Sequence, residues 1–323
     1  SGDWNDGMNR VGIEGRGESV WLAWFLVDIL KRWAAILEQQ GDAARAQGYR
    51  DRAALYVAAV EATAWDGEWY TRAFYDDGTP LGAASGSEPR IDAIAQSWAI
   101  LSGAGDPAHS RRAMDAVAER LIHPQERLSL LFTPPFDGTG HDPGYISDYP
   151  PGIRENGGQY THAATWTAWA YAALGDGQRA GALLEMLCPV GYSDSPEAAA
   201  RYRVEPYVIA ADVYSQPPYV GRGGWTWYTG SASWAWRLGI EAVLGLHKEG
   251  DSLRIAPAIP PAWDGYEMRY RHGATLYTIR VENPQHVAQG VQETTLDGVA
   301  LADGAVPLVD DGKEHAVQVI MGG

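Results

Sequence analysis

The chain has 323 residues, of which 46% are apolar and 20% charged, so it can bury a large core in one or two domains. Its formal net charge is −16. Such an acidic chain is not suited to binding nucleic acid or anionic lipid, whereas a neutral ligand is compatible with it. The single cysteine, Cys188, excludes an internal disulfide framework, and we interpret it as a free structural thiol.

Helical spacing of apolar residues dominates the first part of the chain. Four helices are expected there: residues 19–40, 42–64, 91–102 and 107–121. The apolar run Val20 to Leu30 already contains Asp28, so it is predicted to be a buried helix and not a membrane span. Residues 65–86 contain two Asp-Gly turn signals and are predicted to form a loop or hairpin.

The middle of the chain alternates irregular segments with helices. Residues 133–158 are rich in Pro, Gly and Asp, and a long irregular segment of this kind in a compact domain is usually functional. Further helices are expected at residues 159–174, 177–187, 208–214 and 231–244.

From about residue 246 the pattern changes to short alternating or β-branched segments separated by Pro and Asp-Gly turns. Strands are expected at residues 253–255, 266–270, 275–281, 291–296 and 315–320. They predict a small antiparallel β domain, most often a sandwich or jelly roll. The fold class is therefore mainly α, with a C-terminal β domain.

Four dense motifs are rich in aromatic rings, and three of them also contain carboxylates, the combination that a sugar site requires. They are Asp3-Trp4-Asn5-Asp6, the segment 149–162, Glu205-Pro206-Tyr207 and the segment 223–232. In this order, over roughly residues 1–285, they resemble the inverting phosphorylases of glycoside hydrolase family 94. The sequence of residues 221–230 most resembles the β-1,2-glucan branch of the family. This branch includes 1,2-β-oligoglucan phosphorylase and the C-terminal domain of cyclic β-1,2-glucan synthase.

The resemblance implies the C-terminal portion of an (α/α)6 catalytic barrel in residues 1–245, followed by a jelly-roll-like β-sandwich in residues 246–323. Apart from the short segment 208–214, the helical pattern gives about seven helices, too few to close that barrel. We therefore interpret the chain as a fragment that begins inside the barrel and is inactive alone. It would pair with the N-terminal remainder of its parent, or self-associate, in a family that is often homodimeric.

Inverting phosphorolysis needs one carboxylic acid to protonate the leaving oxygen, because phosphate is already an anionic nucleophile. The resemblance assigns this acid to Asp6, and Asp3 is expected to orient the loop. Taken without the other motifs, residues 3–6 could instead form a turn in which the carboxylates of Asp3 and Asp6 hydrogen-bond to their own backbone.

The resemblance also implies which residues bind the substrates. The phosphate ligands are His162, Thr229 and Gly230. An Arg and an Asp that contact phosphate and the nonreducing-end sugar in the family are expected upstream of residue 1. The sugar-contacting residues are Trp4, Tyr149, Arg154, Glu155 and Trp225. Inorganic phosphate is a substrate here, and no cofactor or metal is expected.

The expected substrate is a β-glucan oligosaccharide, with a β-1,2 linkage favoured. Cellobiose-type members would carry a Gln shortly after Glu-Pro-Tyr, where this chain has Ala210-Ala211. Two alternatives remain open: an inverting hydrolase with Glu155 as the base, and a catalytically incomplete carbohydrate-binding fragment. The expected location is the cytoplasm, either free or on the cytoplasmic side of the inner membrane through the parent protein.

Overall fold

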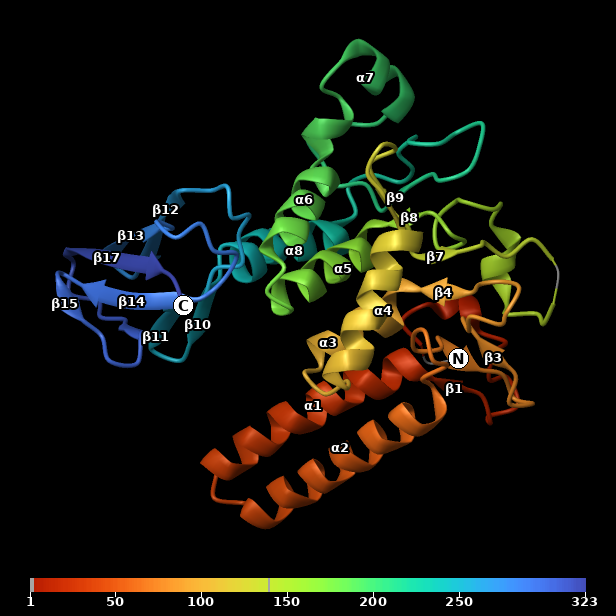
Figure 1. The fold of residues 1–323 in the computed structure, drawn as a ribbon, viewed down its shortest axis with the longest axis horizontal. Helices are drawn as coiled ribbons and strands as arrows, with labels where there is room; N and C mark the ends of the chain where they lie inside the picture. The colour runs from red at the N-terminus through yellow and green to blue at the C-terminus, as the bar shows by residue number, and fades with distance from the viewer. Residues whose placement is uncertain (1–2, 139) are drawn as a thin grey trace. The chain divides into compact units, whose positions relative to one another are not determined.

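The computed structural model describes residues 3–138 and 140–323. The described chain is mainly helical with a β-rich C-terminal region, as the sequence predicts (Figure 1). It divides into two compact units. The first contains the chain up to Ala170 together with Met186–Ala232, and the second contains Tyr171–Glu185 together with Ser233–Gly323. The predicted division at residue 245 into a barrel portion and a β-sandwich stays a prediction.

The first unit opens with two long helices, α1 (Val20–Gln39) and α2 (Ala43–Thr63), which pack side by side as a hairpin (Figure 1). The side chain of Ser19 caps α1 by accepting a hydrogen bond from Leu22 N at 3.1 Å. Ser is a preferred N-cap residue because its oxygen satisfies an otherwise unpaired amide. The predicted helices at 19–40 and 42–64 are confirmed.

The remaining predicted helices are also present, with one exception. They are α3 (Ala93–Leu101), α4 (Pro107–Arg120), α5 (Thr161–Ala173), α6 (Gly177–Leu187) and α8 (Thr229–Arg237), which continues as a π-helix over Leu238–Val243. A short helix, α7 (Pro196–Tyr202), was not predicted, although Ser195 caps it and Pro196 opens it.

The helix predicted at 208–214 is wrong. Asp212–Val213 is strand β9, which pairs antiparallel with β8 (Gln159–Tyr160). The amide of Thr161 also donates to the carbonyl of Ala211 at 2.8 Å. Pairing with a strand about fifty residues away decides this conformation, and local apolar spacing carries no information about such a partner.

Short strands brace the loops of the first unit. The hairpin predicted within residues 65–86 is β2 (Ala73–Phe74) with β3 (Pro80–Leu81), and β1 (Glu18–Ser19) adds to the edge of β2. Two further short pairs join β4 (Ile91–Asp92) to β7 (Phe132–Thr133) and β5 (Ile122–His123) to β6 (Leu128–Ser129).

The second unit contains two sheets. One has the strand order β10-β11-β16 and the other β12-β13-β17-β14-β15. The strands are β10 (Leu246–Glu249), β11 (Ser252–Ile255), β12 (Gly265–His272), β13 (Thr275–Glu282), β14 (Val291–Leu296), β15 (Val299–Ala300), β16 (Val306–Pro307) and β17 (Glu314–Met321). All five predicted strands are present.

The expectation of a wholly antiparallel β domain is wrong at one pair, because β13 and β17 run parallel, with Tyr277 opposite His315. A parallel neighbour needs a long crossover connection. The segment between β13 and β17, which includes β14, β15 and β16, provides it.

Two further features concern the whole described chain. Cys188 is exposed and free. None of the described helices combines the length and the apolar character needed to cross a bilayer.

A histidine between two carboxylates gives the second unit a pH-dependent contact. Nδ1 of His315 lies 2.7 Å from Asp297 Oδ2, and Nε2 lies 3.3 Å from Asp311 Oδ1. Hydrogen bonding to Asp297 raises the pKa of His315 above its ordinary value. A raised histidine pKa stabilises the folded state fully below the unfolded pKa of about 6.5, and this contribution is lost as the pH rises through the folded value.

We therefore expect His315→Gln to lower the free energy of unfolding more at pH 5.5 than at pH 8.5, measured by urea denaturation. His247→Gln, on β10 in the other sheet, is the control and should not follow this pH course. An equal effect of His315→Gln at both pH values would contradict the prediction.

Candidate active site

The loop that carries Asp6 is built from its own side chains. Asn5 is buried, and its side chain accepts a hydrogen bond from Gly7 N at 3.1 Å. Its carbonyl accepts from Met8 N at 3.0 Å, which closes the short 3-10 helix Asp6–Met8. Asp6 is the first residue of this helix, and its side chain is exposed.

A buried ion-pair network holds the start of this loop. Both carboxylate oxygens of Asp3 accept from the guanidinium of Arg72, which is 1% exposed. Asp3 Oδ1 also accepts from Asn5 N at 2.8 Å, and Ser19 Oγ donates to Oδ2. Burial acts to raise the pKa of Asp3, but the charge and hydrogen bonds of Arg72 outweigh it and lower that pKa. These contacts support the predicted orienting role of Asp3.

A second segment, residues 145–156, forms the opposite wall of the site. Its first part is a short 3-10 helix, Tyr145–Asp148. Asn156 is fully buried and donates to the carbonyls of Phe136 at 3.0 Å and Tyr149 at 2.7 Å, while its Oδ1 accepts from Phe136 N at 2.7 Å. Because every hydrogen-bonding atom of this amide group is used, the backbone of Tyr149 is held firmly.

Asp212 joins this segment to residues near the fourth motif. Its buried carboxylate accepts from Arg154 N at 2.9 Å and from Trp225 N at 3.2 Å. Arg154 has a φ of 52°, which is uncommon for a residue other than glycine, so its backbone needs such an anchor. Gly224 is required beside it, since a Cβ there would lie 2.2 Å from Asp212 Oδ1.

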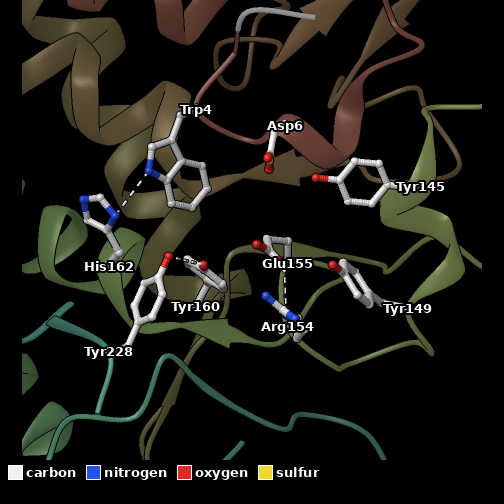
Figure 2. Close-up of a pocket in the computed structure, with 9 residues that line it drawn as sticks. All are labelled: Trp4, Asp6, Tyr145, Tyr149, Arg154, Glu155, Tyr160, His162 and Tyr228. Atoms are coloured by element: carbon white, nitrogen blue, oxygen red, sulfur yellow. Dashed lines mark hydrogen bonds and ion pairs between the residues drawn. The ribbon is translucent and has the colours of Figure 1, made fainter. Parts of the chain in front are cut away.

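These segments enclose a pocket of about 430 Å³ (Figure 2). Its lining combines Tyr and Trp rings with three charged side chains and one histidine. The lining residues are Trp4, Asp6, Tyr145, Tyr149, Arg154, Glu155, Tyr160, His162 and Tyr228. They come from regions of the chain separated by more than 200 residues, so only the folded chain creates the site.

The charged groups of the pocket differ in their surroundings. Glu155 is largely buried, and burial raises its pKa, although Arg154 Nε lies 3.6 Å from its Oε2. Burial and hydrogen bonding to the Asp6 carboxylate raise the pKa of Tyr145 to about 12. Figure 2 shows the hydroxyl of Tyr145 directed toward Asp6, with Glu155 on the other side of the pocket. An exposed acid therefore shares one pocket with a buried one.

The aromatic wall is held together by edge contacts. The ring of Trp4 lies edge-on to Tyr160, with centroids 5.4 Å apart, and to His162 at 5.5 Å. Trp4 Nε1 donates to His162 Nδ1 at 3.3 Å, which assigns the ring proton of a neutral His162 to Nε2 (Figure 2). Burial lowers the pKa of His162 to about 4, so the ring is neutral near pH 7.

Six of the nine predicted site residues line this pocket: Trp4, Asp6, Tyr149, Arg154, Glu155 and His162. The other three do not. Thr229 and Gly230 are exposed at the start of α8, beside the lining residue Tyr228. Trp225 is 63% exposed, and its ring lies 5.5 Å from the guanidinium carbon of Arg154.

Three lining residues were not predicted from the sequence: Tyr145, Tyr160 and Tyr228. Each lies inside or next to a motif or loop that was considered functional. Tyr160 stands two residues before His162, and Tyr228 directly precedes Thr229. A search for Tyr within the motifs could have found these two. Only the fold reveals that Tyr145 faces Asp6.

No group of three or more His, Cys, Asp or Glu side chains that could hold a metal ion is found within residues 3–138 and 140–323. The polar groups of the pocket are instead carboxylates, phenols, a guanidinium and an imidazole. Tyr and Trp rings beside carboxyl groups are a combination that carbohydrate-active sites use, because rings hold the sugar and a carboxylic acid can protonate a glycosidic oxygen.

Comparison with known proteins gives the family. The model described as "Glycosyl hydrolase 94 superfamily, catalytic domain" matches residues 1–245. The chain belongs to the glycosyl hydrolase 94 superfamily.

Two curated relatives illustrate the range of the family. The chain is 51% identical over 280 residues to the cyclic beta-(1,2)-glucan synthase NdvB of Rhizobium meliloti (strain 1021), which covers 87% of this chain and 10% of that protein. It is 31% identical over 323 residues to the solabiose phosphorylase of Paenibacillus borealis, covering 99% of this chain and 41% of that protein. The chain thus spans less than half the length of either relative.

One solved structure shares the fold. A sialidase aligns with a TM-score of 0.58 and 17% sequence identity over 83% of this chain and 24% of that chain. At this identity the likeness concerns the fold alone.

The burial of His162 leads to a direct prediction. Because its pKa is lowered to about 4, its imidazole should stay neutral, with the proton on Nε2, from pH 8 down to about pH 5. Nitrogen-15 NMR of the ring reports both the charge and the tautomer. His315, whose pKa is raised, is the internal control and should become protonated at a higher pH than a free histidine. Protonation of His162 near pH 6.5 would contradict the prediction.

Proposed function

We propose that this chain forms part of the catalytic domain of an inverting phosphorylase that cleaves a β-glucan with inorganic phosphate and releases α-glucose 1-phosphate. The observation that supports this most is the placement of Asp6, which is exposed in a pocket lined by Trp4, Tyr149 and Glu155. Membership of the glycosyl hydrolase 94 superfamily, with phosphorylases among its relatives, favours the same chemistry.

In the proposed reaction Asp6 is the general acid. Its proton passes to the glycosidic oxygen as the bond from that oxygen to the anomeric carbon breaks. A phosphate oxygen attacks the anomeric carbon from the opposite face, and this single displacement inverts the configuration. Tyr145, which hydrogen-bonds to the Asp6 carboxylate, would hold the acid in place and stabilise its carboxylate after proton transfer by donating its O–H.

The proposed sugar contacts are Trp4, Tyr149, Arg154, Glu155 and Trp225. The proposed phosphate ligands are His162, Thr229 and Gly230. Thr229 and Gly230 open α8, and a helix N-terminus offers free amides to an anion. His162 would act as a neutral donor, because burial lowers its pKa. In this proposal residues 1–245 belong to an (α/α)6 barrel and residues 246–323 to a jelly-roll-like sandwich.

For the linkage we propose β-1,2. The 51% identity to a cyclic beta-(1,2)-glucan synthase supports this choice. Ala210 and Ala211 are buried behind the site, where a cellobiose-type enzyme would carry a glutamine. We also propose a cytoplasmic location, either free or at the inner membrane through a longer protein. The proposed reaction uses phosphate as a substrate and needs no cofactor.

A second function has one specific observation in its favour. Glu155 lines the same pocket as Asp6, and an inverting hydrolase needs a second carboxylate to activate water. Burial raises the pKa of Glu155, which makes it a stronger base once ionised but keeps it protonated to a higher pH. Phosphate dependence separates the two functions.

We expect the full-length gene product that contains these residues to cleave β-1,2-linked glucan oligosaccharides only when inorganic phosphate is present. Proton NMR of the product should show α-glucose 1-phosphate, because one displacement inverts the β configuration. Free glucose formed at the same rate with and without phosphate would instead support the hydrolase.

Replacing the acid should have a large effect. Asp6→Asn keeps the size of the side chain but removes the transferable proton, so kcat should fall by roughly 10²–10⁴-fold. Asp148→Asn, in the neighbouring 3-10 helix but outside the pocket lining, is the matched control and should stay within a few-fold of the original enzyme. A similar rate for Asp6→Asn and the original enzyme would remove Asp6 from the mechanism.

A further inference from the structure

A buried arginine lies directly behind the loop that carries Asp6. Among residues 3–138 and 140–323, Arg72 is the only arginine that is buried. Its Nη atoms donate to both carboxylate oxygens of Asp3, and its Nε lies 3.3 Å from Asp92 Oδ2. A guanidinium is suited to this task, since its donors are fixed in one plane and fork toward two acceptors.

The backbone of Arg72 is itself rigidly held. Its amide donates to Leu81 O at 2.7 Å, and its carbonyl accepts from Val20 N at 3.2 Å, so β3 and the start of α1 both bind it. Gly82, directly after β3, approaches so closely that a Cβ there would lie 2.7 Å from Arg72 Cβ. The guanidinium therefore has little freedom to shift.

Its second partner, Asp92, is equally fixed. Asp92 is 1% exposed and caps α3 by accepting from Ile94 N at 2.9 Å. Burial raises the pKa of Asp92 to about 6, so near neutral pH this carboxylate is largely charged and still binds Arg72. The guanidinium thus connects three parts of the first unit: residues 3–8, which we call the acid loop, the start of β2 and the start of α3.

The connection from Arg72 to Asp6 is short. Arg72 holds Asp3, Asp3 Oδ1 accepts from Asn5 N at 2.8 Å, and the Asn5 side chain caps the 3-10 helix that begins at Asp6. Arg72 does not line the pocket. It therefore does not contact a substrate bound in the pocket, and its contacts lead to the reaction through the position of the loop.

We infer that Arg72 is a positioning residue that sets the location of Asp6 through Asp3 and Asn5. The inference rests on the proposed role of Asp6 as the general acid. If it holds, weakening the Arg72–Asp3 pair should impair proton donation selectively, because a misplacement of about 1 Å can lower a rate about 10²-fold. Sugar binding should change little.

The test compares two substrates in the full-length gene product that contains these residues. A β-1,2-linked glucan oligosaccharide needs a proton on its leaving oxygen, whereas a nitrophenyl β-glucoside releases a phenolate that does not. The test variants are Arg72→Lys, which keeps the charge but not the fork, and Asp3→Asn, which leaves Arg72 paired with Asp92. Asp6→Asn shows how loss of the acid itself affects the two substrates.

We expect both test variants to lower kcat on the oligosaccharide at least about 10-fold, with KM changed less than about threefold and a much smaller loss on the aryl glucoside. This is the same pattern as Asp6→Asn, in weaker form. Arg127→Met is the matched control: that half-buried arginine stacks 5.5 Å from the Tyr192 ring, outside the pocket lining. It should affect neither substrate.

Two results would overturn the inference. One is an equal loss on both substrates, which would indicate a general structural effect, and the other is no loss on either. Melting curves accompany each variant, and Asp3→Asn decides alone if Arg72→Lys fails to fold. Retention of oligosaccharide activity by Asp6→Asn would instead refute the proposed acid, so the two failures are distinguished.

Discussion

The buried charge of Arg72 is the constraint on which the acid loop depends. A buried ion is strongly unfavourable unless it is paired, and removing one partner of a buried pair typically destabilises a protein by about 3–5 kcal/mol. Arg72 can therefore be buried only if Asp3 and Asp92 stay against it. If Asp3 moved away, the buried guanidinium of Arg72 would lose one of its two carboxylate partners. The loop that begins at Asp3 is therefore stable in one position. The Asp6 side chain is exposed, so packing around it does not fix its backbone. The position of that backbone follows instead from the pairing of Asp3 with the buried Arg72.

The pocket wall formed by residues 145–156 also depends on a buried charge, the carboxylate of Asp212. Asp212 is a buried carboxylate whose hydrogen bonds come from the amides of Arg154 and Trp225. Because β9 pairs with β8 in a register that places Asp212 beside Tyr160, one strand pair fixes a carboxylate anchor and a pocket ring together. Each wall of the pocket thus depends on a buried carboxylate that is distinct from the exposed acid, and this separates structural carboxylates from the one available for chemistry.

The sequence predicted the parts of this arrangement that depend on local spacing. The helices at 20–39 and 43–63 follow from apolar periodicity, and the assignment of Asp6 follows from the resemblance of its motif to glycoside hydrolase family 94. The strand at Asp212–Val213 and the parallel pairing of β13 with β17 could not be predicted in this way, because both depend on partners distant in sequence. The same reason explains why Arg72 was not predicted. It stands in a hairpin segment with no motif of its own, and its importance comes from a contact 69 residues away.

The charges in the pocket limit how phosphate can bind. The described lining contains two carboxylic acids, Asp6 and Glu155, and one guanidinium, Arg154, while burial keeps His162 neutral. An approaching phosphate dianion would therefore meet at least as much negative as positive charge. Two features reduce this repulsion: Asp6 must be protonated to act as an acid, and burial raises the pKa of Glu155 toward its neutral form. Even then a single guanidinium faces a dianion. The proposed phosphorylase consequently requires further positive charge near the pocket.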